Sequence, residues 1–144
     1  MVQDYLGQKH VYGEVDCIEL IRSFYAKDLE IDFSLPTYPK SREWMKYFTT
    51  DNVDKWASTC STKVQLTAAK NYDVMVFKSE KSNLVIHFGM YLMPSKMFHI
   101  EEGGFSCVQT LSDYWVNKLH TIYRHNELVC LIYWFSIQTS RRRY

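Results

Sequence analysis

Three residues that lie far apart in the sequence can together perform thiol chemistry: Cys17, His87 and His99. A cysteine attacks a carbonyl as its thiolate, which a helix N-terminus stabilises through unpaired amides and the positive end of the helix dipole. An imidazole takes the thiol proton and later gives it to a leaving amine, while a second polar group fixes the tautomer of that imidazole. The set predicts acyl transfer from an amide or ester, with Cys17 as nucleophile, His87 as base and His99 orienting the base.

A predicted helix over residues 17–29 places Cys17 for this role, because apolar side chains recur there at helical spacing. Asp16 precedes the helix and Glu19 follows three positions later, which fits a capping box. In such a box Asp16 accepts from the third helical amide and Glu19 reaches back to the cap. Cys17 is then the first helical residue, and its backbone amide can stabilise an oxyanion.

A predicted strand over residues 84–92 positions His87. Its alternation separates one set of side chains, Ile86, Phe88, Met90 and Leu92, from a second set, His87, Gly89 and Tyr91. We therefore expect His87 on the face that the core leaves free. A turn near residues 94–96 leads into a strand over 96–100, and a three-residue loop would set His99 opposite Gly89 or Tyr91, diagonal to His87. A slip of one residue would move His99 to the other face.

The whole pattern predicts an α+β fold, in which N-terminal helices pack on a small antiparallel sheet or partial barrel. Residues 31–39 suggest an extended connection, and residues 41–47 and 51–58 suggest short flanking helices. Further strands are predicted over 74–77, 121–124 and 128–137, which makes five in all.

The length and composition of the chain limit which functions it can have. The chain has 144 residues, of which 47% are hydrophobic, and this predicts a single domain over 1–144. A formal net charge of +1 argues against a nucleic-acid partner, and the basic residues 141–143 suggest a solvated tail. No leader or membrane-spanning run is visible, so we expect synthesis in a cytoplasm. The four cysteines are too dispersed to signal a disulfide framework or a zinc site, and no metal or cofactor is expected.

The local sequences around these residues are more specific than their spacing. Residues 10–22 read His-Val-Tyr-Gly-Glu-Val-Asp-Cys-Ile-Glu-Leu-Ile-Arg. They resemble the Tyr-x-x-Gly-Gly and Asp-Cys-Ser-Gly-Leu-Val signature of the NlpC family of cell-wall cysteine peptidases. Residues 71–77 are similar to its Gly-Asp-Leu-Val-Phe-Phe strand. Residues 87–92 and 97–99 are similar to its His-Val-Gly-Ile-Tyr-Leu and following Ile-His, and the step from His87 to His99 is the family's usual one.

Residues 22–38, which end in Leu-Pro-Thr-Tyr, and residues 122–125 are similar to the bacteriophage tail-assembly branch of this family. The resemblance covers about residues 5–126 in blocks and leaves 127–144 without a counterpart. It implies a papain-like core, cleavage of a peptidoglycan stem peptide, and a place in a phage tail tip that opens the host wall. Other tail-tip proteins would be partners, and the virion tail would be the location after synthesis in the host cytoplasm.

The resemblance also assigns roles to single residues. It implies that Cys17 is the nucleophile, His87 the base and His99 the third member of the triad. His10 stands where the family usually has a tyrosine that lines the oxyanion site, and Tyr12 where it often has an aromatic residue.

Three departures from the family pattern, Glu14, Ile18 and Glu19, suggest a narrower groove. Two alternatives stay open. One is a related amidase or acyltransferase. The other is a non-catalytic tail module that binds partners through Trp44, Trp56, Trp115 or the C-terminal strand.

Overall fold

The chain folds as helices on a single sheet, and the computed structural model describes residues 1–33 and 37–128. The helices are α1 (Cys17–Asp28), α2 (Thr50–Ala57) and the short α3 (Asp113–Val116). Three 3₁₀ turns are η1 (Val2–Tyr5), η2 (Arg42–Tyr47) and η3 (Leu66–Ala68). The strands are β1 (Ser61–Val64), β2 (Val74–Lys78), β3 (Val85–Leu92), β4 (Lys96–His99), β5 (Cys107–Thr110) and β6 (Leu119–His125).

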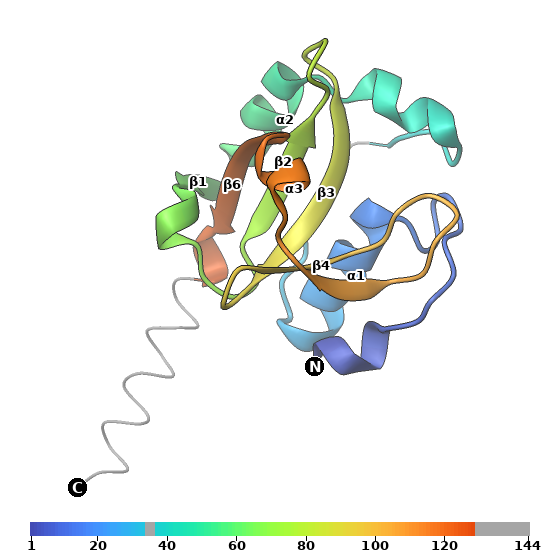
Figure 1. The fold of residues 1–144 in the computed structure, drawn as a ribbon, viewed down its shortest axis with the longest axis vertical. Coiled ribbons are helices and arrows are strands. Elements are labelled where there is room, and N and C mark those ends of the chain that lie inside the picture. The colour runs from blue at the N-terminus through green and yellow to red at the C-terminus, as the bar shows by residue number, and fades with distance from the viewer. Residues whose placement is uncertain (34–36, 129–144) are drawn as a thin grey trace, which may run out of the picture.

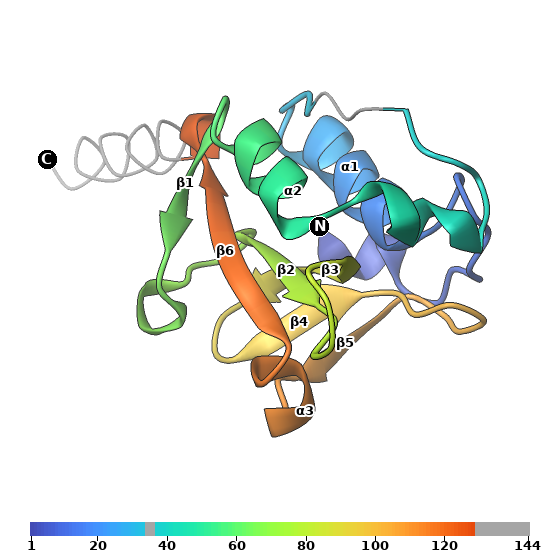
Figure 2. The same ribbon diagram turned by 90° about the horizontal axis from the view of Figure 1, so that it is seen from above.

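The six strands form one antiparallel sheet in the order β1-β6-β2-β3-β4-β5. No pairing within the described residues joins the edge strands β1 and β5, so the sheet is open and does not close into a barrel. Helices α1 and α2 cover one face, while α3 lies against the other (Figures 1 and 2). The predicted α+β class is confirmed.

Both faces of the central strands are buried. The α1 side holds the larger core, which includes Leu20, Ile21, Phe24, Phe88, Met90 and Phe98. The opposite side holds a second cluster, made of Ala69, Met75, Phe77, Tyr91, Met97, Trp115 and Ile122. The prediction that the core leaves the His87 face free is therefore wrong, because α3 brings Trp115 onto that face.

A bulge in β3 changes the predicted alternation. Phe77 pairs with His87 but the next residue, Lys78, pairs with Val85, so Ile86 has no partner in the ladder. Val85 joins the α1 core and Ile86 packs on the second cluster, on the same side as His87. The predicted grouping of Ile86 with Phe88 is wrong for this reason.

Most of the other predicted helices and strands are present in the structure. The long helix, both flanking helices and the strands β2, β3, β4 and β6 are confirmed within one or two residues, although η2 is a 3₁₀ turn. The edge strands β1 and β5 were not predicted, because each is four residues long and has only partly buried and exposed positions, with no fully buried one. Of the strand predicted over 128–137, residue 128 is helical and the rest lies outside the described residues. Among the described residues, no helix is both long and apolar enough to cross a membrane.

Candidate active site

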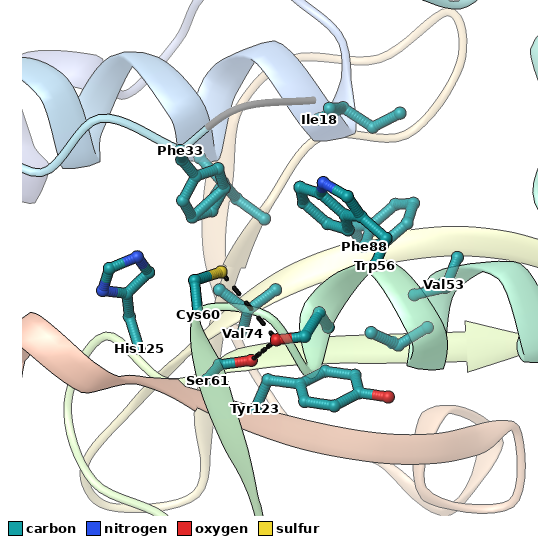
Figure 3. A pocket seen from close by; sticks show the side chains of 13 residues that line it. Ile18, Phe33, Val53, Trp56, Cys60, Ser61, Val74, Phe88, Tyr123 and His125 are labelled. Carbon is teal, nitrogen blue, oxygen red and sulfur yellow. Dashed lines mark hydrogen bonds between the residues drawn. The ribbon is translucent and has the colours of Figure 1, made fainter. Parts of the chain in front are cut away.

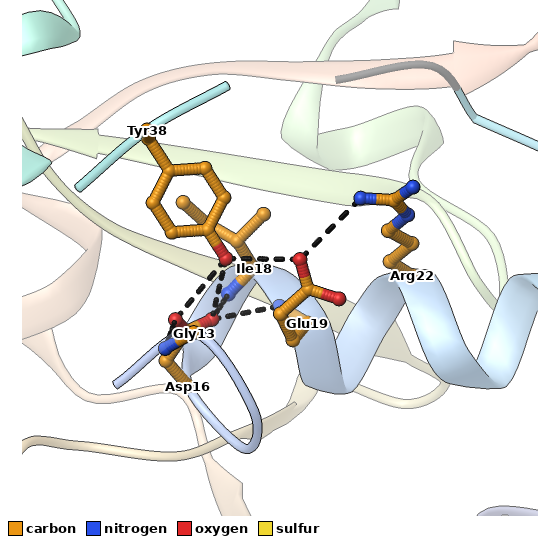
Figure 4. Close-up of polar contacts among 6 residues, drawn as sticks. All are labelled: Gly13, Asp16, Ile18, Glu19, Arg22 and Tyr38. Carbon is orange, nitrogen blue, oxygen red and sulfur yellow. Dashed lines mark hydrogen bonds and ion pairs between the residues drawn. The ribbon is translucent and has the colours of Figure 1, made fainter. Parts of the chain in front are cut away.

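The start of α1 holds Cys17 through the carboxylate of Asp16. One oxygen of this buried carboxylate accepts from the amides of Ile18 at 3.0 Å and Glu19 at 2.8 Å, as the capping prediction requires. The other oxygen accepts from the amide of Gly13 at 2.8 Å, and Gly13 has a left-handed backbone with φ of 75°. The loop before Cys17 is thus tied to the helix that follows it (Figure 4).

Tyr38 adds a bond from a distant part of the chain. Its hydroxyl lies between the carboxylates of Asp16, at 3.1 Å, and Glu19, at 3.0 Å (Figure 4). Glu19 also pairs with Arg22 at 3.4 Å. The predicted return of Glu19 to the cap amide is therefore wrong, because its carboxylate accepts from Tyr38 and pairs with Arg22.

The two histidines meet as predicted. Leu92 pairs with Lys96 across a three-residue loop, and Met90 pairs with Phe98, so His99 stands level with Gly89. His87 is diagonal to His99, and His87 Nε2 lies 2.8 Å from His99 Nδ1. The second ring nitrogen of His99, Nε2, lies 2.9 Å from Gln109 Oε1.

Trp115 covers this pair from α3. Its ring centroid lies 4.8 Å from that of His87 and 5.4 Å from that of His99. Both Trp44 and Trp115 are buried, whereas Trp56 is partly buried against the larger core, so the first two offer no surface for a partner. No pattern in the sequence pointed to Gln109, because it lies on a short edge strand. For Trp115 the sequence predicted only that an aromatic residue of this kind is usually part of the core.

Cys17 and His87 line the same small pocket, whose volume is about 60 Å³. The 3₁₀ turn η2 supplies Trp44 and Met45, and the remaining walls come from His10, Tyr12, Ile86, Ile100 and Glu102. Cys17 is 5% exposed and His87 is 6% exposed. This volume holds a few water molecules but not a peptide.

Burial keeps both Cys17 and His87 neutral. It raises the pKa of the Cys17 thiol to about 12, with a further rise from Asp16, while the amides of Phe88, Cys17 and Ile18 act in the opposite direction. It lowers the pKa of His87 to about 3, and His99 contributes to that shift. The amides at the helix start do favour the Cys17 thiolate, as predicted, but burial of the thiol outweighs them. At neutral pH the pocket therefore holds a thiol beside a neutral imidazole.

His10 and Tyr12 also lie in the pocket, with their rings in edge contact at 4.6 Å between centroids. The Tyr12 hydroxyl is buried and has no hydrogen-bond partner among the described residues. Burial raises the pKa of Tyr12 to about 12, and the neighbouring carboxylate of Glu102 adds to the rise. Their place beside Cys17 agrees with the sequence analysis, and their role at an oxyanion site stays a prediction.

The departures from the family pattern do not narrow this pocket. Glu14 is exposed, and neither Ile18 nor Glu19 is among the residues that line the Cys17 pocket. Ile18 points instead into a separate apolar pocket of about 50 Å³ between α1, α2 and the sheet (Figure 3). That second pocket contains neither Cys17 nor the histidine pair, so the small polar pocket is the candidate active site.

Comparisons with known proteins give the same family. A model of the NlpC/P60 family matches residues 7–124. Three solved structures share the fold. A Staphylococcus aureus Mu50 protein described as similar to a lipoprotein of the NLP/P60 family has 21% identity and a TM-score of 0.56. An NlpC/P60 family protein of Bacillus cereus ATCC 10987 has 15% identity and a TM-score of 0.62. The NlpC/p60 domain of the peptidoglycan hydrolase SagA has 17% identity and a TM-score of 0.58.

The matches differ in how much of each protein they cover. The Staphylococcus aureus and Bacillus cereus matches each cover 86% of this chain, and the SagA match covers 85%. The chain spans only 38% and 37% of the first two proteins but 92% of the SagA domain. No curated protein matches the chain.

Proposed function

The chain belongs to the NlpC/P60 family, and on that premise we propose that it is a cysteine hydrolase that cleaves an amide bond in a peptidoglycan stem peptide. The observation that carries the proposal is the meeting of Cys17 and His87 in one pocket, with His99 bonded to Nε2 of His87. The name of one similar structure, a peptidoglycan hydrolase, supports the substrate class.

The reaction begins with a proton transfer inside the pocket. Because both groups are neutral, Cys17 gives its proton to His87 as the sulfur attacks the carbonyl carbon, rather than resting as a thiolate. The C–N bond then breaks, and His87 returns the proton to the leaving amine. Water, with His87 again as base, hydrolyses the resulting thioester and frees the thiol.

The first turn of α1 leaves one amide for the oxyanion. Asp16 accepts from Ile18 and Glu19, and the helical ladder begins with the Leu20 amide bonded to the Asp16 carbonyl at 2.9 Å. The amide of Cys17 bonds neither to the Asp16 side chain nor within the helical ladder, so it can stabilise the negative oxygen of the tetrahedral intermediate.

A peptide must widen the pocket to reach Cys17. The rim is formed by η2 on one side and by the residues after β4 on the other, where Arg42 and Glu102 lie 3.5 Å apart. This exposed ion pair is worth less than about 1 kcal/mol, so substrate binding can displace it. We place the opening of the groove at this rim.

The setting that we propose is a phage tail tip, where cleavage would open the host wall locally. The support is the likeness of residues 22–38 to tail-assembly proteins of the family. Detection of the chain by mass spectrometry in purified virions tests the setting, and its absence from them would remove that part of the proposal.

Digestion of intact peptidoglycan tests the reaction. Wild type, Cys17→Ala and a matched control, Cys60→Ala, are incubated with the polymer, and the released muropeptides are analysed by mass spectrometry. Wild type and Cys60→Ala should release fragments with new stem-peptide ends, and Cys17→Ala should release none. Transfer of the acyl group to an added amine, without new carboxyl ends, would favour the acyltransferase. No product from any folded variant would favour the non-catalytic tail module.

A further inference from the structure

The histidine pair continues onto a third strand. β4 and β5 pair with His99 opposite Cys107 and Met97 opposite Gln109, so Gln109 is diagonal to His99 on the same face of the sheet. His87, His99 and Gln109 thus follow one another across β3, β4 and β5. Each contact is a hydrogen bond, at 2.8 Å and then at 2.9 Å.

The direction of these bonds fixes where the protons lie. The amide oxygen of Gln109 faces His99 Nε2, so this nitrogen must carry the hydrogen. In a neutral ring the other nitrogen, Nδ1, is then bare and accepts from His87 Nε2. His87 in turn keeps its own hydrogen on Nε2, which leaves the lone pair of Nδ1 free.

We propose that Gln109 is a positioning residue, which sets the tautomers of His99 and His87 so that His87 Nδ1 is the bare nitrogen that receives the proton of Cys17. This inference rests on the proposed function and adds a residue to its machinery. Gln109 touches neither the nucleophile nor the reacting carbonyl, and acts through His99.

The opposite arrangement of protons would disable the base. If the Gln109 amide turned its nitrogen toward His99, then His99 Nε2 would accept and Nδ1 would donate to His87 Nε2. His87 would then carry its hydrogen on Nδ1, where it has no lone pair for the thiol proton. A doubly protonated His99 would likewise donate from Nδ1 and leave His87 with its hydrogen on Nδ1. Burial lowers the pKa of His99 and so opposes this doubly protonated state.

Proton transfer itself leaves the array intact. When Nδ1 of His87 takes the proton of Cys17, the hydrogen on Nε2 still points at His99, and His99 still donates to Gln109. No ring has to turn and no second proton has to move during the reaction. The array therefore orients the base and polarises it without removing its proton, as the orienting carboxylate does in serine hydrolases.

Two substitutions separate this role from simple packing. Gln109→Met keeps the length of the side chain and removes the acceptor. Gln109→Glu keeps an acceptor and cannot donate. Val108→Ala, at an exposed neighbour on the same strand, controls for damage to β5. All variants are checked for folding by thermal unfolding.

Nitrogen-15 NMR of the imidazoles and steady-state kinetics on a stem peptide are then measured. We expect wild type and Gln109→Glu to show His87 protonated on Nε2, and Gln109→Met to show a mixture of the two tautomers. We expect kcat to fall about 10- to 100-fold in Gln109→Met with KM nearly unchanged, and to stay within a few-fold of wild type in Gln109→Glu above neutral pH.

Gln109→Glu should also shift the pH profile. Its negative charge favours protonated His99, which reverses the tautomer of His87, so activity should fall at a higher pH than in wild type as the solution is acidified. A His87 tautomer that is the same in Gln109→Met and wild type would overturn the proposal, as would an equal loss of kcat in the Met and Glu variants. Because the NMR measurement needs no substrate, it decides the role of Gln109 even if peptidoglycan is not cleaved.

Discussion

The two sides of the active-site pocket are held in place by different kinds of contact. On the nucleophile side, Asp16 binds amides no more than three residues away, and among the described residues only Tyr38 bonds to it from a distance. On the base side, His87, His99 and Gln109 come from three strands, and each is joined to the next by a single hydrogen bond. Cys17, the proposed nucleophile, is therefore placed by local structure, and His87, the proposed base, by the register of the sheet.

This difference predicts separate consequences when each side is disturbed. A defect on the nucleophile side should affect both stability and activity, because the same carboxylate caps a helix and positions Cys17. A defect on the base side should affect activity far more than folding, because the two histidines contribute few bonds but define the proton path of the proposed reaction.

The largest effect should come from His87→Ala. Loss of the base should reduce kcat/KM for stem-peptide cleavage at least about 1,000-fold. His120→Ala is the matched control, because His120 bonds to Asp54 at 2.9 Å and does not line the Cys17 pocket. A loss of activity in His120→Ala as large as in His87→Ala would contradict the assignment of the base.

Removal of the cap should have the next largest effect. Asp16→Ala leaves the Gly13, Ile18 and Glu19 amides without their acceptor, so the free energy of unfolding should fall by about 2–3 kcal/mol and cleavage should also slow. Thr49→Ala is the comparison, since Thr49 caps α2 with one bond from Asn52 at 3.2 Å. It should cost about 1 kcal/mol and leave kcat unchanged. Urea unfolding and kinetics measure both, and equal losses of stability would refute the central place given to Asp16.

Acid should weaken the fold through the base side. In the unfolded chain His87 titrates near 6.5, whereas in the folded pocket burial lowers its pKa to about 3, so below pH 6.5 the unfolded state binds the proton and the folded state does not. The stability that comes from keeping His87 neutral is complete above pH 6.5 and is lost toward pH 3. Each pH unit in that window costs about 1.4 kcal/mol, or about 2 kcal/mol at pH 5.

Chemical unfolding at pH 7 and pH 5 measures this loss, with His87→Gln as the control. The variant should be less sensitive to acid than wild type by about 2 kcal/mol, because glutamine does not titrate in this range. The same loss in both proteins would assign the acid sensitivity to other groups, such as His99 and His125, whose pKa values burial also lowers.

The smallest effect should come from Tyr38→Phe. The variant loses the hydroxyl bonds to Asp16 and Glu19 and keeps the ring, which packs at 6.0 Å on Phe48, so it should lose about 1 kcal/mol of stability. Tyr47→Phe, at a tyrosine that is 62% exposed, should change nothing measurable. A change in the His87 tautomer in Tyr38→Phe would mean that the two sides of the pocket are coupled.

The predictions from sequence succeeded where the signal is local. Asp16 caps α1 through backbone groups two and three residues away, and periodicity located the helix and most strands. The diagonal contact of His87 and His99 was also predictable, because it depends on one hairpin with a three-residue loop. The four-residue strand β5, and Gln109 with it, gave too weak a pattern to be predicted.

The sequence by itself determined that Cys17 stands at a capped helix start, that His87 and His99 meet on one face of two neighbouring strands, and that the chain resembles its family. Tertiary structure alone decided that Trp115 closes over the histidines, that Glu19 turns to Tyr38, and that Gln109 completes the array. It also decided the charge states, because a pKa depends on how deeply a group is buried and by what. The physical reason is range: caps and hairpins are set by neighbours in the chain, whereas burial and cross-strand partners are set by segments that meet only in the folded molecule.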